Sequence, residues 1–248
     1  MLMPAQFIAA RLEYVPNATS SKADYPVTNL NIIGSHPLAY SWRSNNLTTN
    51  HTIDLDLGAI KTVAAVALLK LNMLTVTLTY STNGTVFTQF TESPFTMTKD
   101  PFGPYYKKMI AQVVSARYLR IFMPTQTPIT GENFFEIGMV WVTAGLDTFP
   151  YQFVEGMRQT PKRDYIQTGQ DVSPVGMWYS EEDWNSITPN AEIDKYSKFA
   201  LYGQELPVLV FKNLGDLAEV GIYRLRDAVS FTRDSTTMRI STTLRELV

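Results

Sequence analysis

The segment from Trp42 to Phe90 constrains the fold of this chain most strongly, because apolar and polar residues alternate along it. Every second residue is apolar in residues 53–57 and again in residues 76–80, and a further apolar run covers residues 62–71. A β-strand places alternate side chains on opposite faces, so that one face enters the core and the other faces solvent. Asn83-Gly84 follows the last run and supplies two residues that accept positive φ, as a tight hairpin turn requires. The segment therefore predicts three antiparallel strands and no helix.

Composition excludes several classes of protein. The chain has 248 residues and a net charge of −2, so it has no general attraction for nucleic acid or for an anionic membrane. It contains no cysteine, which excludes disulfides, thiolate nucleophiles and zinc–sulfur sites. Residues 1–10 lack the features of a signal peptide, and no window reaches the roughly 18 apolar residues of a membrane span. We therefore expect a protein made in the cytoplasm, with no nucleic-acid partner and no membrane span.

Further strands are predicted on both sides of the central segment. Residues 5–15 precede it, and residues 109–114, 118–123 and 135–143 follow it. One helical turn is expected over residues 26–30, because Pro suits a first helical position. Together these elements predict a mainly β fold, an antiparallel β-sandwich of the jelly-roll type.

Composition changes near residues 145–150, where we expect a domain boundary. Residues 1–146 carry ten basic and eight acidic residues, whereas residues 147–248 carry 11 and 15. The second part also contains the best helical pattern, over residues 191–202, where apolar residues recur at spacings of three and four before Gly203. We expect a β-sandwich over residues 1–146, followed by a small α+β domain with an antiparallel sheet over residues 147–248.

The second domain contains a short acidic segment that is interpreted either as a helix N-terminus or as a calcium site. A helix is expected over residues 181–187, with Ser180 as its N-cap. Glu181, Glu182 and Asp183 suit a helix N-terminus, where acids are favoured electrostatically, and calcium binding is the alternative. Strands are predicted over residues 206–211, 220–225, 228–232 and 238–244.

Five motifs in the first domain resemble, in order and spacing, the discoidin or coagulation factor 5/8 type C family of galactose-binding-like β-sandwiches. They extend over about 120 residues and consist of YPVTNL at residues 25–30 with Trp42-Arg43-Ser44, IDLDLG at 53–58, YSTNGTVFT at 80–88, ARYLRI at 116–121 and FEIG at 135–138. The resemblance implies the sandwich fold. We expect Trp42 to fill the core, with Arg43 or Arg120 extending over it.

The loops at one end of the sandwich carry the candidate ligand residues. Members of the family that bind sugars have exposed aromatic or basic residues there, and the corresponding residues here are Tyr40, Phe102, Tyr105 and Tyr106, with two lysines beside them. Their aromatic faces suit stacking on a sugar. Packing against a neighbouring subunit is the alternative.

Without cysteine and signal peptide, the first domain is most similar to domains of tailed-phage virion proteins. VAAVALL at residues 63–69 contributes to this resemblance. The second domain resembles small β domains of phage tail-tip and baseplate proteins in residues 193–202, 207–210 and 238–246. The resemblance implies a virion protein of a phage tail, made in the host cytoplasm, that contacts other tail or baseplate proteins and copies of itself.

The sequence offers little catalytic chemistry. Neither of the two histidines, His36 and His51, comes with an identifiable nucleophile, oriented base or oxyanion site. A metal site formed by the two histidines and Asp54 is an alternative. Asp54 and Asp56 are otherwise expected to be solvated strand residues rather than metal ligands. We predict no enzyme activity, no cofactor and no metal.

A segment rich in aromatic residues is the candidate interface. The chain has 13 Tyr, 13 Phe, 10 Met and 4 Trp, and two small cores account for most of them. Met177, Trp178, Tyr179 and Trp184 instead cluster in a segment predicted as loop or short helix. Aromatic residues and Met are enriched at the centres of protein interfaces.

We therefore expect a non-enzymatic structural protein of a phage tail tip or baseplate that assembles through protein–protein contacts. The alternative is a lectin-like, carbohydrate-binding module that attaches to a glycan of the host surface. A glycan-processing enzyme is the third hypothesis.

Overall fold

The structure is a computed structural model of the chain. It describes residues 6–8, 11–33, 40–100, 104–145, 147–148, 160–163, 178–189, 194, 197, 200, 207–211, 220–225, 228–233 and 236–246. The chain forms two compact units. The sandwich unit comprises Ala10–Leu146 with Gly215–Val220, and the C-terminal unit comprises Met1–Ala9, Asp147–Leu214 and Gly221–Val248. That each unit is an independently folding domain stays a prediction.

The described part of the sandwich unit consists of antiparallel strands and one short 3₁₀-helix, η1 (Val27–Asn31). The helical turn predicted over residues 26–30 is present, but it begins one residue later, with Pro26 as an extended N-cap instead of the first helical residue. The strands are β2 (Val15–Ala18), β3 (Trp42–Arg43), β4 (His51–Leu71), β5 (Thr75–Ser81), β6 (Thr88–Gln89), β7 (Phe95–Thr96), β8 (Thr98–Lys99), β9 (Tyr106–Met123) and β10 (Glu136–Thr143). Their order is β3–β10–β4–β9–β5–β6, and in addition β2 pairs with β4, β7 with β5 and β8 with β9.

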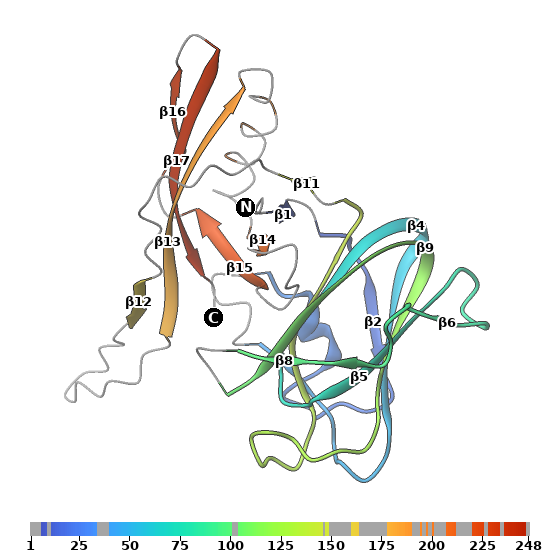
Figure 1. Ribbon diagram of the computed structural model, residues 1–248. Helices are drawn as coiled ribbons and strands as arrows, with labels where there is room; N and C mark the ends of the chain where they lie inside the picture. The colour runs from blue at the N-terminus through green and yellow to red at the C-terminus, as the bar shows by residue number, and fades with distance from the viewer. Residues whose placement is uncertain are drawn as a thin grey trace, which may run out of the picture. The chain divides into compact units, whose positions relative to one another are not determined.

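Two long strands replace four of the predicted ones. β4 joins residues 53–57 to residues 62–71, and β9 joins residues 109–114 to residues 118–123. The two strands arch over together (Figure 1), and their pairing continues on both sides of the arch. The sequence suggested a turn in each strand because the residues at the bend are polar or small. A partner strand that bends alongside makes a turn unnecessary.

The bend of β4 lies between Asp56 and Lys61, where its pairing with β9 shifts register. Gly58 has a φ of +77° there, a conformation that glycine adopts without the steric cost of a Cβ atom. The Gly58 N–H donates to Asp56 Oδ1 over 2.8 Å, and Arg117 of β9 donates to both Asp56 oxygens over 3.0 and 3.1 Å. Asp56 therefore holds the two bent strands together, instead of being only a solvated strand residue.

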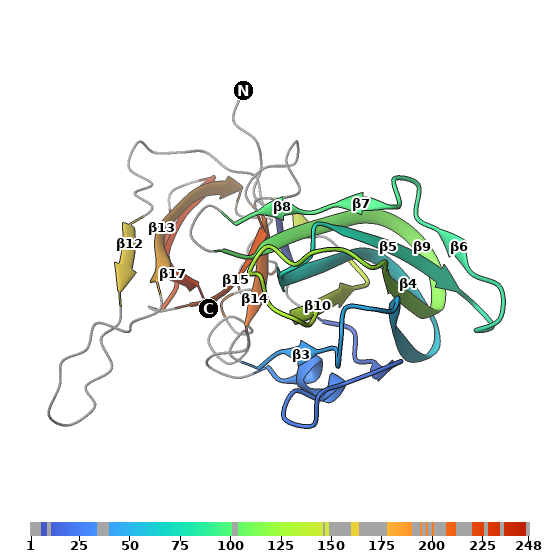
Figure 2. The same ribbon diagram turned by 90° about the horizontal axis from the view of Figure 1, so that it is seen from below.

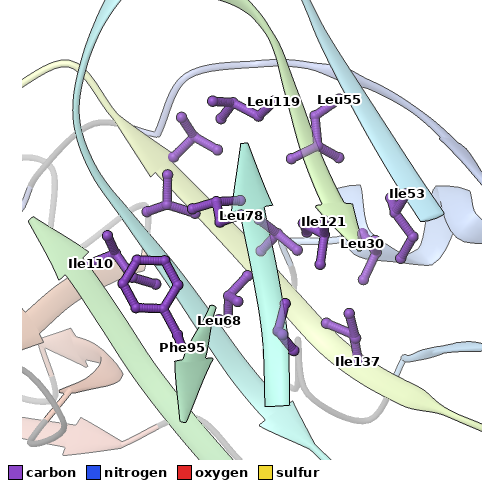
Figure 3. Close-up of a cluster of buried hydrophobic side chains, with 14 of the residues drawn as sticks. Leu30, Ile53, Leu55, Leu68, Leu78, Phe95, Ile110, Leu119, Ile121 and Ile137 are labelled. Atoms are coloured by element: carbon purple, nitrogen blue, oxygen red, sulfur yellow. The ribbon is translucent and has the colours of Figure 1, made fainter. Parts of the chain in front are cut away.

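The bend folds the sheet over a single apolar core. Ile53 and Leu55 precede the bend and Leu68 and Leu71 follow it, yet all four belong to one cluster of buried side chains. Figure 3 shows Ile53 and Leu55 gathered with Leu68 and with residues of the neighbouring strands. The two halves of the sheet therefore face each other, and the predicted mainly β, antiparallel fold class is confirmed.

Trp42 lies within this core with none of its surface exposed. Its indole Nε1 donates to the carbonyl oxygen of Ser20 and to Ser21 Oγ, both over 3.0 Å. A buried indole N–H requires such an acceptor, so these bonds fix the ring relative to the loop before η1.

The expectation that Arg43 or Arg120 lies over Trp42 is wrong. Arg43 follows Trp42 directly in β3, and consecutive strand residues point to opposite faces. Arg120 pairs with Asp54 across β9 and β4, with Nε to Oδ1 at 2.6 Å, and its guanidinium carbon lies 4.0 Å from the ring centroid of Phe87. Asp54 is thus bound by an arginine.

The connection from β5 to β6 is longer than the predicted two-residue turn. Gly84 has a φ of +78°, but Asn83 does not have a positive φ. Asn83 Oδ1 instead accepts hydrogen bonds from the N–H groups of Thr85 and Val86 over 3.0 and 3.1 Å. Asn83 therefore shapes the loop through its side chain.

The C-terminal unit contains an antiparallel sheet. Its described strands are β1 (Gln6–Ile8), β11 (Asp147–Thr148), β12 (Thr160–Arg163), β13 (Trp178–Pro189), β14 (Val208–Phe211), β15 (Val220–Leu225), β16 (Ser230–Arg233) and β17 (Thr237–Glu246). The order is β11–β1–β14–β15–β17–β13–β12, with β16 beside β17 (Figure 1). Figure 2 shows β12, β13, β17 and β15 of this sheet in succession. β1 was predicted to belong to the first domain, but it pairs with β11 and β14 of the C-terminal unit. Residues 194, 197 and 200 are helical, within the predicted helix.

The predicted helix over residues 181–187 is wrong, and so is the N-cap role of Ser180. These residues belong to β13, which pairs with β17 over nine consecutive residue pairs from Glu181–Arg245 to Pro189–Thr237. Local propensity allowed a helix, but a long partner strand with matching register determines the conformation.

Candidate functional site

Three strand ends lie side by side at the end of the sandwich away from the bend. Glu136 at the start of β10 pairs with Arg43 of β3, and the neighbouring Ile137 pairs with Leu71 at the end of β4. Lys70 precedes Leu71. We call the group formed here by Tyr25, Arg43, Lys70, Tyr105, Phe134 and Glu136 the open-end cluster.

A buried carboxylate organises the open-end cluster. Glu136 is 2% exposed; its Oε2 lies 3.4 Å from Arg43 Nη2, and its Oε1 lies 3.3 Å from Lys70 Nζ. The side chains of Arg43 and Lys70 remain 24% and 21% exposed. A buried ion pair is costly to break, because the remaining charge loses its partner. Glu136 therefore holds two cationic groups in place at the surface.

Lys70 reaches Glu136 through an uncommon backbone conformation. Its φ is +55°, and it is the single non-glycine residue with positive φ in the described part of the chain. A Cβ atom at Gly138 would lie 2.7 Å from Lys70 Cβ, so glycine is required beside it. Such a conformation costs about 1–3 kcal/mol and persists where the surroundings hold it. The fold maintains this strain and thereby places the Lys70 ammonium group beside Glu136.

Asn72 fixes the start of β10 from the other side. The Glu136 N–H donates to Asn72 Oδ1 over 2.8 Å, and Asn72 Nδ2 donates to the Phe134 carbonyl oxygen over 2.9 Å. Asn72 is fully buried. These bonds prevent the segment from Phe134 to Glu136 from shifting, and so they fix the carboxylate on which the cations depend.

Aromatic rings cover the cations of the cluster. The Arg43 guanidinium carbon lies 3.8 Å from the ring centroid of Tyr25 and 4.6 Å from that of Phe134. Lys22 Nζ lies 4.1 Å from the Phe134 centroid. A cation over an aromatic face is attracted by the ring quadrupole. The rings therefore restrict the positions of these cationic groups.

Tyr105 stands half-buried at the border of the cluster, with Lys70 Nζ 5.2 Å from its ring centroid. Burial raises the pKa of its hydroxyl, Glu136 raises it further, and Arg43 acts in the opposite direction. The hydroxyl therefore stays neutral near pH 7 and can donate a hydrogen bond as well as accept one. Tyr105 offers both a ring and a polar group to a ligand.

The open-end cluster suits recognition by stacking and hydrogen bonding. The side chains of its two glutamate-bound cations are partly exposed, and Tyr105 contributes an aromatic ring with a neutral hydroxyl. Apolar surface combined with a few fixed polar groups is typical of small-ligand sites.

The structure describes three of the four predicted loop residues, and they lie in different surroundings. Tyr105 belongs to the open-end cluster, whereas Tyr106 packs against the sandwich core. Tyr40 is 50% exposed, and Phe102 lies outside the described residues. A ligand role for any of them stays a prediction.

The predicted interface residues lie on β13. Trp178, Tyr179 and Trp184 belong to this strand, and Met177 lies outside the described residues. Their segment was predicted as loop or short helix, and the structure corrects it to a strand. Their role in an interface stays a prediction.

His51 is held as a core residue. It is 2% exposed, its Nδ1 lies 3.0 Å from Ser20 Oγ, and its Nε2 lies 2.9 Å from the Asn46 carbonyl oxygen. Because a carbonyl oxygen only accepts, Nε2 donates to Asn46. The sequence did not predict this contact between Ser20 and His51. The buried His51 ring has a structural role. His36 lies outside the described residues.

Within the residues that the structure describes, no group of three or more potential metal ligands occurs. The same part of the chain has no helix long and apolar enough to span a membrane.

Sequence reasoning missed Lys70, Asn72 and Glu136 as site residues. Lys70 gives one usable signal, because a single charge interrupts an otherwise apolar run in residues 62–71. Glu136 occurs in the FEIG motif, but burial between two cations depends on strands far apart in the sequence. No local pattern marks Asn72.

Comparisons with known proteins give structural similarities. No model of a known protein family matches the chain, and no curated protein sequence matches it. Among solved structures, chitosan-binding module 1 of a chitosanase/glucanase from Paenibacillus sp. IK-5 is 18% identical, with a TM-score of 0.40, over 54% of this chain and 97% of that one.

Two further solved structures are similar over about the same share of this chain. The family 32 carbohydrate-binding module of C. perfringens NanJ, in complex with galactose, is 17% identical, with a TM-score of 0.43, over 56% of this chain and 98% of that one. A pectin-binding carbohydrate-binding module is 14% identical, with a TM-score of 0.41, over 54% and 91%. The TM-scores lie below 0.5, so these similarities by themselves assign no function to the chain.

Proposed function

We propose that the chain is a non-enzymatic, glycan-binding protein whose ligand surface is the open-end cluster. The observation that carries this proposal is the arrangement of Tyr105 beside Lys70 and Arg43, both fixed by the buried Glu136. A sugar ring presents C–H groups to an aromatic surface and hydroxyls to hydrogen-bonding groups, and this cluster has both.

The charges of the cluster favour a ligand rich in hydroxyl groups. Glu136 pairs with both Arg43 and Lys70, so their attraction for an additional anion is reduced. Their N–H groups still donate, and the neutral Tyr105 hydroxyl both donates and accepts. Recognition through fixed hydrogen bonds suits a polyhydroxyl ligand.

A glycan array probed with the full chain tests the proposal. We expect saturable binding to a subset of glycans, abolished by Tyr105→Ala and weakened by Arg43→Ala. Tyr105→Phe should retain part of the affinity, since it keeps the ring and loses one hydroxyl.

Phe87→Ala is the matched control, because Phe87 forms the same kind of cation–ring contact with Arg120 away from the cluster. It should leave glycan binding unchanged. Absence of binding to any glycan, or an equal loss in Tyr105→Ala and Phe87→Ala, would contradict the proposal.

A second candidate is a structural protein of a phage tail tip or baseplate, present in the virion and made in the host cytoplasm. It would contact other tail or baseplate proteins and copies of itself. Four apolar side chains are strongly exposed and available to a protein partner: Val15, Ile60, Val86 and Val113 are 71%, 60%, 70% and 74% exposed. The resemblance of the sequence to tailed-phage virion domains supports the phage context of this candidate.

Mass spectrometry of purified phage particles tests this second candidate. The chain should be present at a fixed copy number per particle, and a version lacking residues 147–248 should not be incorporated. Absence of the full chain from purified particles, or normal incorporation of the shortened version, would contradict it.

A further inference from the structure

A hollow of about 160 Å³ lies beside β9, and none of its lining residues belongs to the open-end cluster. The lining comes from residues 108–112 of β9 and from the segment of residues 91–95 that runs alongside. An apolar cavity of about 150 Å³ holds a benzene molecule. The hollow therefore has room for one chemical group of about that size.

The inner wall of the hollow is apolar. Phe95, Met109 and Ile110 line it, and all three are buried. Figure 3 shows Phe95 beside Ile110 at the border of the core. Burial of apolar surface is favourable, so this wall can take up an apolar group of a ligand. Because the Phe95 ring is itself buried, the wall offers no aromatic face for stacking on a sugar ring and suits a small group such as methyl.

Polar side chains with fixed positions border the hollow. Gln112 Oε1 accepts the N–H of Thr91 over 2.8 Å, so its Nε2 remains as a donor. Lys108 Nζ donates to the Thr96 carbonyl oxygen over 3.0 Å and has two further N–H groups. Glu92 follows Thr91, is exposed and accepts hydrogen bonds. The β9 side of the rim thus supplies donors, and the opposite side supplies an acceptor.

This rim favours a neutral group that both accepts and donates hydrogen bonds. A small anion would meet the carboxylate of Glu92, and a small cation would meet the ammonium group of Lys108; like charges disfavour both. A secondary amide accepts through its C=O and donates through its N–H. With a methyl group on the carbonyl carbon it is an acetamido group, which is smaller than benzene and also matches the apolar wall.

We propose that the hollow is a second binding site of this protein and takes the N-acetyl group of an amino sugar. The methyl group contacts the apolar wall, the amide C=O accepts from Lys108 Nζ, and the amide N–H donates to Glu92. The choice of a sugar as the carrier of the acetyl group rests on the proposed glycan binding. The site itself uses no residue of the open-end cluster.

Saturation-transfer difference NMR with the full chain and N-acetylglucosamine tests the proposal. We expect the strongest saturation at the acetyl methyl protons, because this group lies deepest in the protein. A site for one small group binds weakly, which a glycan array does not retain but saturation transfer detects.

Three comparison ligands identify the group that is bound and its carrier. Glucosamine and glucose lack the acetyl group and should bind about tenfold more weakly, because they lose the amide hydrogen bonds and the methyl contact. Nε-acetyl-lysine methyl amide carries the same acetyl group on a peptide side chain. It should also bind more weakly than the sugar, because it has no hydroxyl groups for the polar rim.

Variants assign the signal to the hollow. Ala111→Leu enlarges an exposed residue of the lining, so it should occupy the hollow and abolish the methyl saturation. Ser115→Leu is the matched control, because Ser115 is exposed on the same strand and lies outside the lining. Lys108→Met keeps an unbranched apolar side chain beside Phe95 but loses the donor, and it should weaken binding about tenfold.

Tyr105→Ala separates this inference from the proposed function. It removes the ligand surface proposed for the open-end cluster, and it should retain the methyl saturation. Loss of the saturation in Tyr105→Ala would place the sugar at the open-end cluster and overturn the inference. Array binding that survives Tyr105→Ala, with the saturation intact, would overturn only the proposed role of the open-end cluster.

Four further results would overturn the inference and leave the proposed function intact. They are no methyl saturation by N-acetylglucosamine in a protein that binds the glycan array, equal binding of glucose, an unchanged signal in Ala111→Leu, and binding of the acetyl-lysine compound as tight as that of the sugar.

Discussion

Lys70 and Gly138 show how one residue's position depends on another far along the chain. Lys70 has a φ of +55°, and Gly138 leaves the space that this conformation needs. The resulting contact of Lys70 with Glu136 is the basis of the open-end cluster. The position of the Lys70 ammonium group therefore depends on the lack of a side chain at Gly138 as well as on the charge of Glu136.

Gly138→Ala should lower the free energy of unfolding by about 1–3 kcal/mol, the usual cost of overpacking. The new Cβ atom would lie 2.7 Å from Lys70 Cβ. Gly145→Ala is the control, since nothing lies within 4 Å of a Cβ atom there. Urea denaturation measures both. Equal stability of the two variants would show that Lys70 moves away without cost.

Trp42→Ala should lower the free energy of unfolding by about 3–5 kcal/mol, as for other aromatic residues removed from cores. Trp42 is fully buried and also bonds Ser20 and Ser21 through its indole N–H. Trp42→Phe should cost less, because it retains most of the packing. A Trp42→Ala protein as stable as the wild type would contradict the burial of this residue.

The sequence predicts single residues well where burial follows from alternation. Ile53 and Leu55 are examples, because a period of two assigns both to the core face. Glu136 is the opposite case. Its role arises when Arg43 and Lys70 approach from two other strands, and local sequence does not encode such an approach.

Among the elements, β4 and β9 determine the sandwich because they bend together. Asp56 holds this bend through Gly58 and Arg117. The two predicted strands within β4 have correct faces, but their continuity depends on pairing with β9. The error at β13 has the same origin, since its partner residues in β17 lie 48 to 64 positions away in the sequence and impose the strand.

Asp56→Asn should reduce the loss of stability in acid. The hydrogen bond from Arg117 is the main cause that lowers the pKa of Asp56 below its usual 3.8, and the Gly58 N–H acts in the same direction. The charged carboxylate therefore stabilises the fold above about pH 3.8, and this contribution disappears as pH falls through the lower folded pKa.

Urea denaturation between pH 6 and pH 2.5 measures this effect, with Asp24→Asn on an exposed turn as the control. The wild type and the control should lose stability in parallel, and Asp56→Asn should lose less. Identical curves for all three proteins would show that the bend does not depend on this ion pair.

At the scale of the whole molecule, the chain is divided into two units, and the sequence predicts this division only in part. Among the described residues, the buried members of the sandwich core cluster all lie between Tyr14 and Val142. The charge difference between residues 1–146 and 147–248 predicts a boundary, but it does not indicate that β1 joins the C-terminal sheet.

A fragment of residues 10–146 should therefore fold alone and retain glycan binding. Circular dichroism should show a β spectrum with a cooperative thermal transition, and the glycan array should give the same pattern as the full chain. An unfolded fragment would mean that the two units depend on each other for folding.

The central claim is that the open-end cluster is the ligand surface, and chemical-shift mapping tests it most directly. The labelled full chain is titrated with the best glycan from the array, and the backbone amide shifts are followed. The account predicts the largest shifts at residues 22–25, Arg43, Lys70, Tyr105 and residues 132–136. Shifts concentrated at the bend of β4 and β9, or in the loop between β5 and β6, would contradict it.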